Sequence, residues 1–141
     1  MDSLTALFDL IGELARRRYQ MAERYFSTAG LNHTEARLLT LLSQEGGSAT
    51  QDRLSGLLFI DRSNAGRALK RLERDGYIAR TKDDADKRAN LVEMNIKGCK
   101  AVDEIAQLKK EMVKEFLGDL SSRDAATVLG LLEQSATTYE N

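Results

Sequence analysis

The chain has 141 residues, 42% hydrophobic and 30% charged, with a net charge of −1, which fits one soluble domain or one domain with appended helices. No apolar run approaches the roughly 18 residues needed to cross a bilayer, and the N-terminus resembles neither a signal nor a transit peptide, so we expect no membrane partner and a cytoplasmic location. The single cysteine excludes an intramolecular disulfide framework and a multi-cysteine zinc site, and there is only one histidine. The sequence contains no P-loop, glycine-rich dinucleotide turn, metal-ligand cluster or nucleophile motif, so we predict that the protein binds no metal or cofactor and is not an enzyme.

The first predicted element is a long amphipathic helix over residues 4–26, because apolar residues recur there at steps of three and four. Gly30 ends this segment. Asn32, with Glu35 three residues later, has the pattern of a capping box and begins a second helix, which stops at the glycine pair 46–47.

Two shorter helices follow and together predict a helix-turn-helix. Thr50 caps the first of them, and Asp61 caps the second, which extends over about 62–75 and ends at Gly76. The turn at about 57–61 contains no glycine, so other residues must form it.

A short strand is predicted at 77–82, then a charged turn, then a strand at 90–96 whose apolar residues alternate. This β-hairpin directly after a helix-turn-helix predicts a wing. Asn95 can cap a long helix, and Ser121 with Asp124 restarts a final one. The predicted fold class is mainly α, a winged helix-turn-helix with a small β-hairpin wing and additional helices at both ends.

The charge is unevenly distributed along the chain. Residues 53–88 contain ten basic and six acidic residues, a net +4, and the remainder carries −5, which favours a local polyanion-binding surface. Helix 62–74 has five bases and one acid, and a division into apolar and polar faces that suits a helix docked in the DNA major groove. Its candidate DNA-binding residues are Arg62, Ser63, Asn64, Arg67, Lys70 and Arg71. The alternative is an ordinary surface helix with a basic outer face.

The turn of the hairpin is a second candidate site, formed by Asp86, Lys87 and Arg88. An arginine at a hairpin tip can enter the narrow minor groove of A·T-rich DNA. Asp86 can orient its guanidinium through a charge-assisted hydrogen bond. Taken alone, the pattern also fits a polar turn with a weak surface ion pair.

These motifs resemble the MarR family of winged helix-turn-helix transcriptional regulators. The resemblance covers nearly the whole chain and is carried by 61–64, 72–80, and 86–88 with 92–98. It implies that Ser63, Asn64 and Arg67 read the groove, that Arg88 enters the minor groove, and that Asp86 orients it. Gly66 departs from the family, in which a Ser or Thr is more usual, and close approach of DNA or a neighbouring helix would explain it.

The terminal helices predict self-association, because they present more apolar surface than the small winged core can cover. The expected partners are a second copy of the chain and double-stranded DNA with a palindromic operator. The expected domains are a dimerisation helix at 1–30, the DNA-binding domain at 31–98 and further dimerisation helices at 99–141. The resemblance also implies repression that a small-molecule ligand releases.

A small aromatic or anionic effector is a further expected partner, since relatives bind aromatic acids between the dimer helices and the winged domain. The speculative ligand-binding residues are Arg16, Arg17, Arg18, Tyr19 and His33. A solvated helix face and an exposed histidine at a loop end are the simpler alternatives. Cys99 is either a redox sensor or, as we favour, a small apolar filler. The main functional alternative is a winged-helix module that binds protein instead of DNA.

Overall fold

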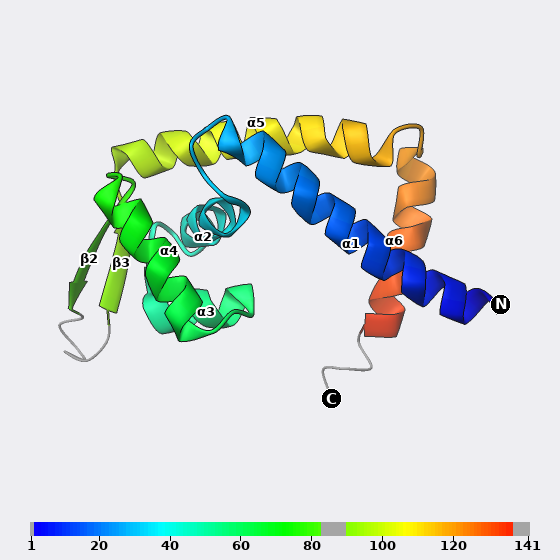
Figure 1. The fold of residues 1–141 in the computed structure, drawn as a ribbon, viewed down its shortest axis with the longest axis horizontal. Helices are drawn as coiled ribbons and strands as arrows, with labels where there is room; N and C mark the ends of the chain where they lie inside the picture. Colours follow the sequence, from blue (N-terminus) through cyan, green and yellow to red (C-terminus); the bar gives the residue numbers. More distant parts are fainter. Residues whose placement is uncertain (1, 83–89, 137–141) are drawn as a thin grey trace.

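The computed structural model describes residues 2–82 and 90–136 of the chain. The predicted fold class is confirmed: the described part is mainly helical with a small antiparallel sheet (Figure 1). In chain order the elements are α1 (Ser3–Ser27), α2 (His33–Gln44), β1 (Ser48–Thr50), α3 (Gln51–Leu58), α4 (Arg62–Arg74), β2 (Ile78–Lys82), β3 (Asn90–Met94), α5 (Ile96–Leu117) and α6 (Ser122–Ala136). No described helix is long and apolar enough to span a bilayer.

The helices begin where the predicted capping residues stand. Asn32 accepts a hydrogen bond from the Glu35 backbone N–H, and the Glu35 carboxylate accepts one from the Asn32 N–H, which confirms the capping box. The side chains of Thr50, Asp61 and Asn95 each accept from the backbone N–H three residues ahead and cap α3, α4 and α5. These bonds satisfy N–H groups that have no partner inside the helix.

The turn between α3 and α4 is built without glycine, as predicted. Phe59 adopts a left-handed backbone with φ of 57° and ψ of 39°. The Ser55 hydroxyl donates to the Ile60 carbonyl at 2.8 Å, and Ile60 packs against the core. The reversal places α4 across α3 and completes the helix-turn-helix.

The sheet has three strands in the order β1-β3-β2, all antiparallel. The hairpin of β2 and β3 confirms the prediction, with Ile78 opposite Met94 and Lys82 opposite Asn90. The sequence analysis did not predict β1, which pairs Ser48 with Glu93 on the other edge of β3. Three residues are too few for the alternation of apolar and polar residues that indicates a strand.

The hydrophobic core lies beneath the helix-turn-helix and receives residues from both terminal segments. Its largest fully buried side chains are Leu38, Leu39, Leu42, Leu54, Leu69, Leu72 and Val92. Phe26 from α1 and Ala101 and Ile105 from α5 join this cluster. The rest of α1, the C-terminal end of α5 and α6 extend away from the winged part (Figure 1).

Candidate nucleic-acid interface

Helix α4 is firmly anchored to the core along one face. Ala65, Ala68, Leu69 and Leu72 are each no more than 1% exposed, and their spacing places them on a single stripe. Burial of this stripe fixes the rotation of α4 about its axis. The opposite face therefore carries its polar side chains outward in a defined direction.

A chain of hydrogen bonds orders the outward side chains at the N-terminal end of α4. The Asn64 amide nitrogen donates to Asp61 at 2.8 Å, and the Asn64 amide oxygen accepts from the Arg67 guanidinium. Ser63 is exposed beside them. The structure thus brings Ser63, Asn64 and Arg67 together on the exposed surface of the N-terminal half of α4.

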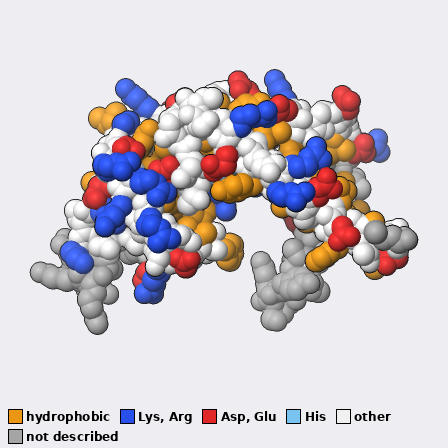
Figure 2. All heavy atoms as spheres, in the orientation of Figure 1, with side chains coloured by type: hydrophobic (Ala, Val, Ile, Leu, Met, Phe, Trp, Pro, Cys, Tyr) orange, Lys and Arg blue, Asp and Glu red, His pale blue; other side chains and the backbone are white. Residues whose placement is uncertain are grey.

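The remaining basic residues of α4 have mixed surroundings. Arg62 forms an ion pair with Asp52 at 3.2 Å. Arg71 is half-buried and lies 3.6 Å from the buried carboxylate of Glu35, so it also ties α4 to α2. Lys70 is exposed. Figure 2 shows Lys and Arg side chains gathered over α4, and Arg67, Lys70, Arg71 and Arg74 line a shallow hollow there. The described face is suited to a polyanion.

Gly66 lies close to the neighbouring helix. A Cβ atom at this position would lie 3.2 Å from the side-chain nitrogen of Gln51, the first residue of α3. The Gln51 amide oxygen accepts from Asn90 at 3.5 Å, which connects the first turn of α3 to the hairpin. The neighbouring helix therefore approaches Gly66 through the end of one flexible side chain, which a small shift of the Gln51 amide could accommodate.

The arms of the wing rise beside α4. Arg80 on β2 donates to Glu73 of α4 at 3.2 Å and joins the hairpin to that helix. The predicted wing residues Asp86, Lys87 and Arg88 lie outside the described residues.

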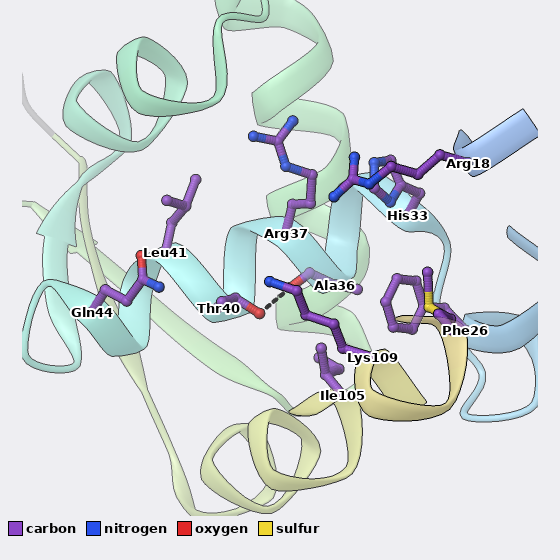
Figure 3. Close-up of a pocket in the computed structure, with 11 residues that line it drawn as sticks. Arg18, Phe26, His33, Ala36, Arg37, Thr40, Leu41, Gln44, Ile105 and Lys109 are labelled. Atoms are coloured by element: carbon purple, nitrogen blue, oxygen red, sulfur yellow. Dashed lines mark hydrogen bonds between the residues drawn. The ribbon is translucent and has the colours of Figure 1, made fainter. Parts of the chain in front are cut away.

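A separate cavity of about 150 Å³ lies where α1, α2 and α5 meet (Figure 3). Three cationic side chains and one histidine line it, from three helices: Arg18, Arg37, Lys109 and His33. Phe26, Ile105 and Met112 supply apolar wall. A largely apolar hollow of about 220 Å³ adjoins it and shares Arg18, Lys109 and Met112. Cationic groups beside apolar wall suit an amphipathic anion.

His33 is held within this cavity rather than exposed at a loop end. Its ring stacks on Phe26, with ring centroids 6.3 Å apart, and meets the edge of Tyr19 at 5.4 Å. Its Nδ1 atom is buried and has no hydrogen-bond partner among the described residues. Burial, and then the charges of Arg18 and Arg37, lower the pKa of His33. The ring is therefore kept neutral more strongly than a free histidine.

The other speculative ligand residues are dispersed. Arg18 lines the cavity with His33 and Tyr19 touches the His33 ring, but Arg16 and Arg17 line different surface hollows. A helix turns about 100° per residue, so three consecutive arginines cannot share one face. Cys99 is exposed in the first turn of α5, so the expectation of an apolar filler is wrong.

Comparison with known proteins finds similarity to one family of regulators. The MarR family profile matches residues 29–89, which include the helix-turn-helix. The transcriptional activatory protein BadR of Rhodopseudomonas palustris is 29% identical over 136 residues, covering 94% of this chain and 77% of BadR. The chain is therefore similar to MarR-family transcriptional regulators, through the profile match over residues 29–89 and through BadR over most of its length.

Solved MarR-family structures share the fold. A MarR variant from E. coli complexed with operator DNA matches with a TM-score of 0.83 and 22% identity, over 96% of this chain and 99% of that chain. The organohalide-sensing regulator RdhR in its 2,4-dichlorophenol-bound form matches with a TM-score of 0.84 and 16% identity, over 98% and 82%. Both fold similarities extend beyond the winged part to the terminal helices.

Most residues of the cavity were not predicted from the sequence. Arg37 stands one helical turn after His33, and that i, i+4 spacing could have signalled a shared face. Lys109 and Met112 carried no such signal, because α5 is brought to α2 only by the tertiary fold.

Proposed function

We propose that the protein is a sequence-specific DNA-binding regulator that inserts α4 into the major groove. The observation that carries this proposal is the division of α4, whose apolar stripe is buried while its basic and amide side chains face outward. The E. coli MarR variant of the same fold is complexed with operator DNA, which supports the same docking.

Within this proposal the residues have separate roles. Arg67 and Asn64 read base edges, because guanidinium and amide groups bond bidentately to guanine and adenine. Ser63, Arg62 and Lys70 contact phosphates or bases near the N-terminal half of α4, and Arg71 contributes positive potential from its position beside Glu35. Asp86, Lys87 and Arg88 form the minor-groove contact of the wing, by resemblance to the family.

The regulator is proposed to act as a homodimer through its terminal segments, 1–30 and 99–141, around the DNA-binding part at 31–98. These segments expose many large apolar side chains that a monomer leaves in water: Leu4, Leu7, Phe8, Leu10, Ile11, Val113, Leu117, Leu120, Val128, Leu129, Leu131 and Leu132. We propose that a second copy of the chain buries these side chains, because a two-fold dimer places its two recognition helices about 34 Å apart, which matches the half-sites of a palindromic operator.

The cavity is proposed to bind an anionic or aromatic effector that releases the regulator from DNA. Arg18, Arg37 and Lys109 supply positive charge, and the free Nδ1 of His33 supplies a polar contact. RdhR is solved with 2,4-dichlorophenol, an aromatic compound, and has the same fold. Benzoate and neutral benzamide are suitable probes, and Arg37→Ala should weaken benzoate selectively.

Repression is the proposed direction of regulation, from the resemblance to the family, although BadR is named as a transcriptional activatory protein. A reporter placed behind the selected operator tests the direction: lower expression with the protein present supports repression, and higher expression contradicts it.

The central experiment is selection of bound duplexes from a random DNA library, followed by affinity measurements at two salt concentrations. If each protomer neutralises two or more phosphates, the log–log slope against salt should be about −4 or steeper. Arg67→Ala should reduce enrichment of the selected sequence, whereas Arg123→Ala on α6 should not. If no duplex is enriched and binding does not respond to salt, the protein-binding module is the better explanation.

A further inference from the structure

Phe59 is both strained and almost fully exposed. Among the described residues it is the only non-glycine with positive φ, and its side chain is 92% exposed, the highest value among the exposed large hydrophobic residues. A bulky side chain in the left-handed region is an outlier. Glycine or asparagine would form the same turn at lower conformational cost.

The fold itself does not use the phenyl ring. The turn is held by backbone groups, with the Phe59 N–H donating to the Gly56 carbonyl at 3.3 Å and the Ile60 N–H donating to the Ser55 carbonyl at 3.4 Å. Ile60 is the turn residue that packs into the core. The left-handed conformation directs Phe59 the other way, into solvent, so an external partner is the remaining use for the ring.

The location of Phe59 indicates what that partner is. It stands two residues before Asp61, the cap of α4, and so at the same end of that helix as Ser63 and Asn64. Arg62, 80% exposed in its side chain, is adjacent to this turn and marks the surface as attractive to a polyanion. In a helix-turn-helix, the N-terminal end of the second helix approaches the base edges.

The major groove offers one apolar group to such a ring, the 5-methyl of thymine. We propose that Phe59 is a specificity residue that contacts a thymine methyl group beside the bases faced by the N-terminal end of α4. This inference rests on the proposed DNA-binding function and adds to it an apolar base contact that lies outside the recognition helix. The strain and the exposure in the free protein are then explained together.

The test separates the ring from the backbone conformation. Phe59→Gly and Phe59→Asn remove the ring but keep residues that accept a left-handed backbone, so both variants should melt at or above the wild-type temperature. Ile96→Ala is the matched control, since Ile96 is 77% exposed but lies at the start of α5, next to the end of α4 remote from this turn. Each protein is measured on the duplex that the wild type selects from a random library.

Each thymine of that duplex is then replaced singly by deoxyuridine, which lacks only the methyl group. Wild type should lose about fourfold in affinity at the contacted thymine, the value of one methyl group removed from water. Both Phe59 variants should bind the unmodified duplex about fivefold more weakly or worse, and should show no further loss at that thymine. Ile96→Ala should keep the wild-type profile.

Three outcomes would overturn the inference. If the folded Phe59 variants bind the selected duplex as tightly as wild type, or lose the same affinity as wild type at each deoxyuridine replacement, Phe59 does not contact a thymine methyl group. The proposed DNA-binding function would still hold in that case. If the wild type selects no duplex, the proposed function fails and this contact with it. If the two variants instead lose binding equally on random and selected DNA, the ring contacts the backbone and is not a specificity residue.

Discussion

Gly98→Ala is expected to be the most damaging single-methyl change that the described structure suggests. Gly98 lies in the first turn of α5, against the base of the hairpin. A Cβ atom there would lie 2.5 Å from the Met94 Cγ and closer still to the backbone oxygen of Tyr77. Met94 can change rotamer, but the Tyr77 carbonyl cannot move freely, because the Tyr77 N–H is bonded to Leu72 at 2.9 Å.

To restore ordinary contact, α5 must move roughly 1 Å away from the hairpin. Overpacking of this kind costs about 2–3 kcal/mol, which corresponds to a fall in Tm of about 5–15 °C for a chain of this size. Because α5 carries both core residues and the proposed dimer surface, the same shift should weaken operator binding by misplacing the wing.

The assay is thermal unfolding followed by circular dichroism at fixed protein concentration. Gly56→Ala is the matched control, since Gly56 lies within α3 with no atom within 4 Å of its would-be Cβ. That change should raise the free energy of unfolding by up to about 1 kcal/mol, through helix propensity alone. If Gly98→Ala melts within about 1 °C of wild type, the argument from the close contact is wrong.

Four further predictions concern function and pH. The free energy of unfolding should fall as the pH drops below 6.5, because His33 takes up a proton there in the unfolded chain, whereas its lowered pKa keeps it neutral in the folded chain until lower pH. Denaturant unfolding should be measured across pH for wild type and for His33→Asn, which removes the only histidine. The difference between their free energies of unfolding isolates this dependence. Arg67→Ala should cost about 1–3 kcal/mol on the selected operator and less on random DNA, measured by titration; equal losses would make it a phosphate contact. Leu131→Lys on α6 should weaken dimerisation about tenfold or more in sedimentation, whereas Ile96→Lys should not. Arg88→Ala should lose more affinity on A·T-rich than on G·C-rich flanks, and Asp86→Ala should also weaken binding; tighter binding by Asp86→Ala would contradict an orienting role.

Local features of this chain were predictable because their causes lie within a few residues. The capping box of Asn32 and Glu35, the cap at Asp61 and the restart at Ser121, whose hydroxyl accepts from the Asp124 N–H at 3.0 Å, all depend on spacings of three. The glycine-free turn was predictable for the same reason. The apolar stripe of α4 follows from helical periodicity alone.

Features that depend on distant partners were not predictable in this way. Strand β1 exists because β3 offers an edge more than 40 residues later, and nothing in its three residues indicates this pairing. The cavity needs Lys109 to return beside His33 through the packing of α5 on α2. Its sequence position predicts that Arg71 points outward with the other basic residues of α4, but in the structure it is half-buried beside the buried carboxylate of Glu35. Each case is settled by tertiary contacts that periodicity does not encode.

The division of faces on α2 has a consequence for how this regulator can be altered. Leu38, Leu39 and Leu42 hold the helix in the core, whereas Arg37 and Thr40 line the cavity from the same two turns. Replacing Arg37 or Thr40 therefore leaves the packing stripe intact and should cost little stability, whereas Phe26 and Ile105 of the cavity wall belong to the core. A library confined to Arg37 and Thr40 could be screened for response to new small molecules, with the helix-turn-helix serving as an unchanged output. The architecture thus separates the part that would select an inducer from the part that would select a promoter, which is the property a biosensor engineer seeks.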